Sequence, residues 1–361
     1  MEKIKRIFVF KLLIRTATGT YCLQDKVINY KVNAQYKEKL PFDSNSIFSI
    51  KTEDDFNKAA LAVFNFQYKH NPVYQTYCKH LKVVPEDINR YEAIPFLPIS
   101  FFKTHKVAAF QGEPEVTFSS SGTTGSITSK HPVKELAIYK QSFMAGFEAV
   151  YGSIKDYVVI GLLPSYLERE GSSLIYMVDH LIKASNQAES GFFLNEYDAL
   201  LDLLNKCKNK KVVLIGVSYA LLDFGEKYRP QLKNTIIMET GGMKGKRKEM
   251  IKSELHATLK SYFGVEAIHS EYGMTELLSQ AYSVGTAFTC PPWMKILTRS
   301  YTDPLSLISH KTGGINVIDL ANIYSCSFIA TQDLGKVYPS HFEVVGRFDN
   351  SDIRGCNLLV Q

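Results

Sequence analysis

The sequence has few of the features that mark special classes of protein. Its 361 residues include only six cysteines, no two of them form a Cys-x-x-Cys pair, and no cluster of cysteine and histidine has the spacing of a zinc site. Scattered cysteines in a chain of this length are typical of a reducing compartment. We therefore expect a cytoplasmic protein without a disulfide framework.

Long hydrophobic runs are also missing. No stretch approaches the roughly 20 apolar residues of a membrane span. Residues 1–15 combine basic residues with a short apolar run, but Lys11 interrupts the run, Arg15 closes it, and no clear cleavage site follows. We therefore expect neither an integral membrane segment nor a signal peptide.

Concentrated charge is the third feature that the chain lacks. The net charge of +6 is spread along the sequence, whereas a nucleic-acid binder usually gathers basic residues in a stripe or an arm. The densest basic cluster, residues 244–248, is expected to open a helix. This cluster either forms a solvated face of the helix or attracts an anionic ligand locally.

The order of apolar patterns predicts an α/β protein. Apolar strands alternate with amphipathic helices from about residue 115, which favours a mostly parallel sheet covered by helices on both faces. Shorter strands after residue 300 predict a small β-rich section. We divide the chain into a weakly attached N-terminal extension (1–45), a main domain (46–345), and a hinge-like motif with a C-terminal tail (346–361).

Several helices can be predicted individually. Residues 53–82 have helical periodicity that breaks at Asn71-Pro72. Residues 134–152 form a second helix, with an apolar face that includes Phe143 and Val150. Residues 246–264 form a third, which Gly264 is placed to end.

The first notable motif is a Ser/Thr/Gly-rich loop at residues 119–126, placed between a strand and a predicted helix. Glycines let the backbone approach a ligand closely, and hydroxyl and N–H groups can cradle phosphate oxygens. It is not a Walker A loop, because no Gly-Lys-Ser/Thr follows. A flexible surface loop is the alternative.

Two further motifs end predicted strands. The glycines of residues 239–243 could let a flat aromatic ring lie against the backbone. In residues 270–276, Tyr272 could stack on a base, Thr275 could donate to a phosphate, and Glu276 could hold Mg²⁺, which prefers carboxylate and water oxygens. Each motif alone is also compatible with an ordinary turn.

Two motifs lie near the end of the chain. Asp333 precedes a glycine and could accept hydrogen bonds from both hydroxyls of a ribose. Arg347 could bond to ribose or phosphate, and Asp349 could be a hinge. Taken singly, both segments could be surface turns.

The order and spacing of these five motifs resemble the adenylate-forming superfamily, which includes acyl- and aryl-CoA synthetases, firefly luciferase and peptide-synthetase adenylation domains. A closer resemblance, over roughly residues 46–361, is to the LuxE-type acyl-protein synthetases, the ATP-dependent subunit of bacterial long-chain fatty-acid reductase. The segments that carry it are residues 48–74, 162–182, 238–250 and 270–282.

The resemblance implies a nucleotide site and a set of roles. Thr275 and Glu276 would serve phosphate and Mg²⁺, and Asp333 and Arg347 would contact ribose. The phosphate and adenine positions follow from the matching motifs: Ser120, Ser121, Gly122, Thr123, Thr124 and Gly125 for the phosphates, and Gly241, Gly242, Met243, Tyr272 and Gly273 for adenine.

One departure from the superfamily matters. Most members continue for about another hundred residues past the Gly-Arg-x-Asp hinge, into a lid domain that carries a catalytic lysine. Here the lid is missing or very short, as it is in LuxE-type proteins. The cation at the transition state is left unassigned among Lys244, Lys246 and Lys336, and we interpret His131 as an ordinary surface histidine.

Cys356 is the candidate acyl acceptor. LuxE-type proteins carry the acyl group on a cysteine of a mobile C-terminal tail, and Cys356 matches that placement. Gly355 would give local freedom and Arg354 would favour the thiolate, the nucleophilic form. The alternative is a bystander cysteine on a short terminal strand.

The expected activity is ATP- and Mg²⁺-dependent conversion of a carboxylic acid, of the fatty class, to an acyl-adenylate. The acyl group then passes to the cysteine and onward to a partner protein, such as a reductase or a carrier. The rival hypotheses are a phenylacetate-type acyl- or aryl-CoA ligase and a nucleotide-binding scaffold without turnover.

Overall fold

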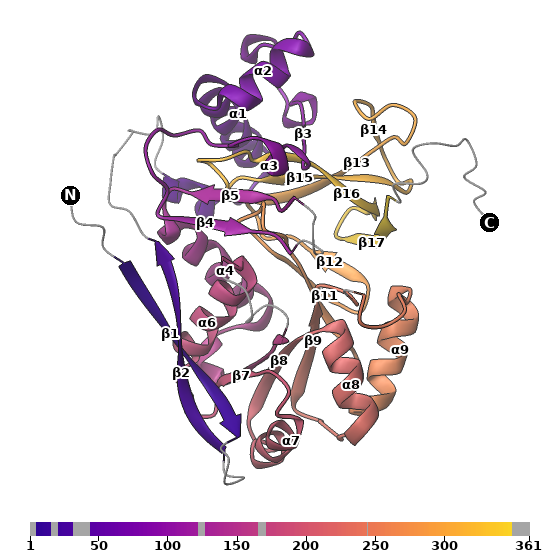
Figure 1. The fold of residues 1–361 in the computed structure, drawn as a ribbon. Helices are drawn as coiled ribbons and strands as arrows, with labels where there is room; N and C mark the ends of the chain where they lie inside the picture. Colours follow the sequence, from indigo (N-terminus) through magenta and orange to yellow (C-terminus); the bar gives the residue numbers. More distant parts are fainter. Residues whose placement is uncertain are drawn as a thin grey trace.

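A large mixed sheet organises the protein, as the computed structural model shows (Figure 1). The model describes residues 5–15, 21–31, 44–121, 127–164, 171–243 and 245–348. The predicted parallel section is confirmed: neighbouring strands run parallel in the order β7 (Gly191–Phe193), β6 (Tyr157–Leu162), β8 (Lys211–Val217), β9 (Thr235–Thr240) and β10 (His269–Tyr272).

Burial explains why these strands read as continuous apolar runs. All six residues of β6 are buried, because helices cover both faces of a parallel sheet. The helices of this part of the chain are α4 (Leu136–Tyr151), α6 (Ser173–Ser185), α7 (Tyr197–Lys206), α8 (Ser218–Tyr228) and α9 (Lys252–Phe263). In Figure 1, α4 and α6 lie on one side of the strands, and α8 and α9 lie on the other.

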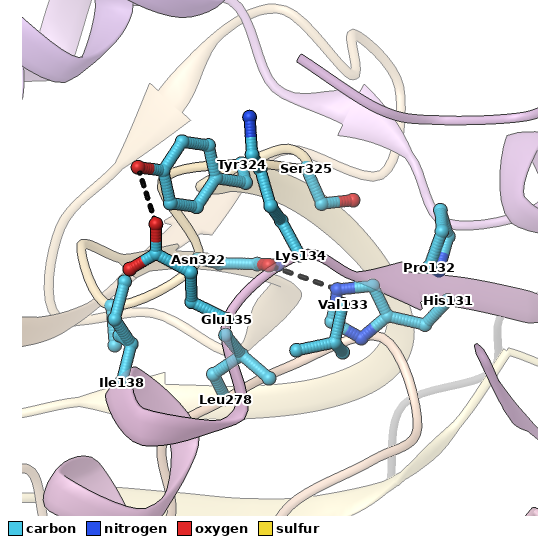
Figure 2. Close-up of a pocket in the computed structure, with 11 residues that line it drawn as sticks. His131, Pro132, Val133, Lys134, Glu135, Ile138, Leu278, Asn322, Tyr324 and Ser325 are labelled. Carbon is cyan, nitrogen blue, oxygen red and sulfur yellow. Dashed lines mark hydrogen bonds between the residues drawn. The ribbon is translucent and has the colours of Figure 1, made fainter. Parts of the chain in front are cut away.

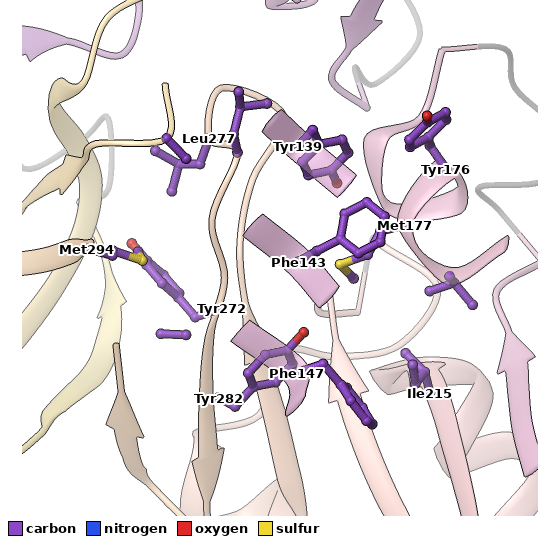
Figure 3. Close-up of a cluster of buried hydrophobic side chains, with 14 of the residues drawn as sticks. Tyr139, Phe143, Phe147, Tyr176, Met177, Ile215, Tyr272, Leu277, Tyr282 and Met294 are labelled. Carbon is purple, nitrogen blue, oxygen red and sulfur yellow. The ribbon is translucent and has the colours of Figure 1, made fainter. Parts of the chain in front are cut away.

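Aromatic side chains fill the space between α4 and the sheet. Figure 3 shows Phe143 and Phe147 of α4 beside Tyr176 and Tyr282, and all four are buried. The apolar face predicted for this helix is confirmed except at its last turn, where Val150 is 41% exposed.

The predicted β-rich section is an antiparallel continuation of the same sheet. Beyond β10 the strands pair in the order β11, β12, β17, β16, β15, β13 and β14. Their bounds are Ala281–Val284, Ala287–Thr289, Phe342–Arg347, Phe328–Val337, Gly313–Asp319, Met294–Arg299 and Leu307–Ile308. The short β3 (Leu97–Pro98) pairs in parallel with β16.

The N-terminal strands form a hairpin at the other edge of the sheet. β1 (Lys5–Arg15) and β2 (Tyr21–Lys31) pair antiparallel, and β1 pairs with β7 at Leu12 and Phe192. The division of the chain at residue 45 stays a prediction.

The predicted helix break at Asn71-Pro72 is confirmed. α1 (Glu53–His70) begins at a capping box formed by Thr52 and Asp55, and Asn71 caps α2 (Pro72–His80), whose first residue is the proline. Short helical turns complete the set: η1 (Ser44–Ser49), η2 (Pro85–Asp87), η3 (Tyr91–Ala93), α3 (Phe101–Thr104) and η4 (Ile154–Asp156). Among the described residues, no helix is both long enough and apolar enough to cross a membrane.

The predicted start of α9 is wrong, although its end is confirmed. The helix begins at Lys252, so the basic cluster precedes it instead of opening it. Gly245 has a φ of +68°, which a helix does not allow, and Arg247 instead forms ion pairs with Asp223 and Glu226 of α8. Gly264 ends the helix in the left-handed conformation, with a φ of +64°.

Candidate functional site

The predicted phosphate loop lies inside a β-hairpin. β4 (Val116–Ser119) and β5 (Lys130–Val133) pair antiparallel, with Ser119 opposite Lys130. The loop lies between a strand and a helix as predicted, but β5, which was not predicted, separates it from α4, and α4 starts at residue 136.

Two serines close the loop at its base. The Ser129 N–H donates to Ser120 Oγ over 2.9 Å, and the Ser120 N–H donates to the Ser129 carbonyl oxygen over 3.1 Å. Ser121 is exposed at the start of the loop. The predicted phosphate-binding residues at the tip, Gly122, Thr123, Thr124 and Gly125, lie outside the described residues.

This hairpin meets the segment that contains Thr275 and Glu276. The Ser129 hydroxyl hydrogen-bonds to the Glu276 carboxylate. His131 Nδ1 lies 2.7 Å from the Thr275 carbonyl oxygen. The interpretation of His131 as a surface histidine is wrong: it is completely buried, because its ring packs edge-on against Phe102 and bonds to polar groups at both nitrogens.

Glu276 is a buried carboxyl group in an electropositive setting. Burial raises its pKa, while the hydrogen bond from Ser129 and the charges of Lys103 and Arg347 act in the opposite direction. A bound cation would favour the charged form further. Lys103 lies in α3, which precedes the loop hairpin, and no pattern in the sequence identified it as a site residue.

The ribose-binding candidates also come together. The Tyr272 hydroxyl donates to Asp333 Oδ2 over 2.9 Å, and Arg347 Nε donates to Asp333 Oδ1 over 3.0 Å. Asp333 and Arg347 are directly opposite each other on β16 and β17, so these segments are strands and not surface turns. Tyr272 is 9% exposed and packs edge-on against Phe288 and Phe342.

The paired glycines follow β9, beside the end of β10. Gly241 and Gly242 have φ values of +77° and +76°, a region that disfavours other residues. A Cβ added to Gly242 would meet nothing within 4 Å, so the surface above it is open. Met243 is buried, and Gly273 lies so close to the Glu271 carboxylate that a side chain there would collide with it.

The three lysines predicted as candidates for the transition-state cation differ in where they lie. Lys244 lies outside the described residues. The Lys246 backbone N–H donates to the Met243 carbonyl oxygen in a turn, and the Lys336 ammonium lies 4.9 Å from the centre of the Tyr338 ring. The positive charges that lower the pKa of Glu276 are instead those of Lys103 and Arg347.

The cysteines whose side chains are described are poor nucleophiles. Cys78, Cys207, Cys290 and Cys326 are free thiols, and burial raises the pKa of each, to about 12 for Cys78 and Cys290. Cys356, the predicted acyl acceptor, lies outside the described residues, as does Asp349.

The donor set around Glu276 suits a magnesium ion better than a transition metal. Within the described residues, no three His, Cys, Asp or Glu side chains are grouped to bind a metal ion. Mg²⁺ is usually held by one or two carboxylates together with water and substrate phosphate oxygens, so the single carboxylate of Glu276 is sufficient.

A small cavity lies behind this site, between β5 and the turn that joins β15 to β16 (Figure 2). Its volume is about 10 Å³, which is room for about one water molecule, so it is not the nucleotide site. The figure shows His131 and Asn322 facing each other beside it.

Comparison with known proteins decides the family. The model of the LuxE acyl-protein synthetases matches residues 37–361. The chain belongs to this family. A long-chain-fatty-acid–luciferin-component ligase of Photorhabdus luminescens is 39% identical over 69 residues, which are 19% of the chain and 59% of that relative. The chain thus spans less than two thirds of this curated LuxE relative.

Solved structures confirm the adenylate-forming fold of this LuxE family member. A 2-hydroxyisobutyryl-CoA ligase in complex with 2-HIB-AMP and CoA has a TM-score of 0.63 at 9% identity, covering 82% of the chain and 70% of the ligase. ATP-bound MatB from Rhodopseudomonas palustris has a TM-score of 0.50 at 17% identity, covering 66% and 49%.

Proposed function

We propose that the protein uses Mg·ATP to convert a carboxylic acid of the fatty class to an acyl-adenylate, and then transfers the acyl group to Cys356. The observation that carries the proposal is the convergence of the loop hairpin on Glu276, next to the cluster of Tyr272, Asp333 and Arg347. The loop would hold phosphates, Asp333 and Arg347 would hold ribose, and Tyr272 with the open surface of Gly242 would frame adenine.

In the first step a carboxylate oxygen attacks the α-phosphorus and pyrophosphate leaves. Mg²⁺ would supply charge neutralisation at the phosphate oxygens, held by Glu276. Lys103 and Arg347 add positive charge at the same place and would stabilise the charge that develops there.

In the second step the Cys356 thiolate attacks the acyl carbonyl, and AMP leaves with the electrons of the broken bond. The thiols of the half-buried Cys290 and the buried Cys326 are unsuited to this role because their pKa values are raised. The acyl group would pass onward to a partner protein, a reductase or a carrier. The cytoplasmic location expected from cysteine usage stays a prediction.

Intact-protein mass spectrometry tests the acyl transfer. After incubation with ATP, Mg²⁺ and a panel of fatty and aromatic acids, we expect the wild type to gain the mass of one acyl group. Cys356→Ser should gain none, while the control Cys290→Ser should behave like the wild type. An unmodified wild type that forms AMP only when CoA is added would instead indicate a CoA ligase.

Exchange of labelled pyrophosphate into ATP tests the first step separately. Glu276→Gln should lower the exchange rate about 100-fold, because the variant loses a charged group at the phosphates. The exposed Glu254→Gln serves as the control and should leave the rate unchanged. Wild-type exchange in Glu276→Gln would contradict the metal role, and no exchange with any acid in the wild type would indicate a scaffold without turnover.

A further inference from the structure

The buried His131 joins three segments that are distant in sequence. It belongs to β5, the strand that leaves the loop, and it contacts the Thr275 carbonyl oxygen and Asn322 of the β15–β16 turn. Asn322 Oδ1 lies 2.9 Å from His131 Nε2, the contact drawn in Figure 2. The loop is thereby tied to the backbone immediately before Glu276.

Asn322 extends this connection to Glu276 itself. Its side-chain amide donates to the carbonyl oxygen of Glu276 over 2.8 Å and to that of Cys326 over 2.9 Å. Both acceptors are backbone carbonyls, so they fix which end of the amide faces His131. The peptide group of Glu276 is therefore held by Asn322, and the His131 ring contacts the Thr275 carbonyl on the same side.

The turn that carries Asn322 is itself anchored. Gln67 of α1 donates to the carbonyl oxygens of Asn322 and Ile323 and to Ser327 Oγ, and accepts from the Ser327 N–H. All four bonds are between 2.9 and 3.0 Å long. Asn322 is therefore held in place by contacts between its turn and α1, and a positioning residue must itself be held in place.

His131 contacts its neighbours but does not act as a catalytic acid or base. Burial lowers its pKa to about 4, against the effect of its two oxygen neighbours, so the ring is neutral at neutral pH. A neutral ring donates from one nitrogen. Because Asn322 Oδ1 can only accept, we place that proton on Nε2, which donates to it over 2.9 Å. With no exposed surface, the ring cannot touch a substrate.

We propose that His131 and Asn322 form a positioning pair, which sets the distance between the phosphate-binding loop and the Thr275–Glu276 segment during adenylation. The inference rests on the proposed function and adds to it two residues that no motif identified. Displacements near 1 Å at such a site can cost about 100-fold in rate, whereas ground-state binding is less sensitive.

Pyrophosphate exchange of His131→Asn tests the pair. The side chain introduced by this substitution can place its amide where Nδ1 of His131 lies, but it does not reach the position of Nε2. The hydrogen bond to Asn322 Oδ1 is therefore lost. The matched control is His180→Asn, because His180 is also a histidine with a pKa lowered to about 4 by burial, and its Nδ1 contacts the Tyr176 carbonyl oxygen in its own helix. Asn322→Ala is the second variant, which removes the partner.

We expect kcat for exchange to fall about 10- to 100-fold in His131→Asn and Asn322→Ala with KM for ATP within about threefold. The Mg²⁺ concentration for half-maximal exchange should rise in both and stay unchanged in His180→Asn. All variants are assayed well below their unfolding temperatures. Equal losses of kcat in His131→Asn and His180→Asn, or an unchanged Mg²⁺ requirement in His131→Asn and Asn322→Ala, would contradict the positioning role. The proposed function would then still stand. A wild type without exchange would overturn both.

Discussion

At the scale of single residues, two carboxylates at the ends of neighbouring strands behave in opposite ways. Burial works against ionisation of Glu239, but the nearby His256, at 3.6 Å, and a hydrogen bond from Lys252 outweigh it and lower its pKa to about 2. Burial and the nearby charge of Glu239 raise the pKa of Glu271 to about 7, although the Thr240 hydroxyl donates to it. One site therefore holds a permanent charge next to a carboxyl group that titrates near neutrality.

Glu271→Gln should change how stability depends on pH. A carboxyl group with a pKa raised from 4.5 to about 7 binds a proton more tightly in the folded state, so its contribution is present below pH 4.5 and is lost as the pH rises to 7. Glutamine does not ionise, so the stability of the variant does not fall in this way. Its free energy of unfolding should exceed that of the wild type by about 1–3 kcal/mol at pH 8, with little difference at pH 5.

Urea unfolding at both pH values measures this difference. The exposed Glu266→Gln is the control and should follow the wild type at both. A Glu271→Gln variant whose difference from the wild type is the same at pH 5 and pH 8 would show that Glu271 is ionised throughout.

At the scale of elements, the end of α9 depends on one glycine. Gly264→Ala should destabilise the protein by about 1–2 kcal/mol, because its φ is +64° and a methyl group would collide with the Gln231 amide. Gly146→Ala is the matched control inside α4, where a Cβ meets nothing within 4 Å and alanine favours the helix. Thermal unfolding should shift down for the first and slightly up for the second; a downward shift of equal size in both would refute the conformational argument.

The same helix shows what local patterns can and cannot predict. Its apolar spacing and Gly264 correctly predicted the body and the end, because both depend on neighbours in sequence. Its start could not be predicted, since Arg247 is held by the acidic residues of α8, which lie about twenty positions earlier. The first strand of the loop hairpin, β4, was predicted, but its partner β5 was missed because four residues are too few to produce a periodic signal.

At the scale of the whole molecule, the sequence predicted the sheet and most of the site. Continuous apolar strands predicted the parallel section, which is confirmed. The motifs at strand ends predicted Tyr272 and Glu276 as site residues, because ligands of such sheets bind where strands end, and their roles stay predictions. His131, Asn322 and Lys103 could not be found this way. Their importance depends on long-range contacts, and a single histidine or lysine has no pattern of its own.

The bonds made by Gln67 have a consequence for how the chain folds during its synthesis. Its buried amide finds its partners 255 to 260 residues later in the sequence. At about 5–20 residues per second, a ribosome needs roughly 13–50 s to make that stretch. During that interval the Gln67 amide can hydrogen-bond only to water, so the apolar face of α1 stays accessible to chaperones that bind nascent chains.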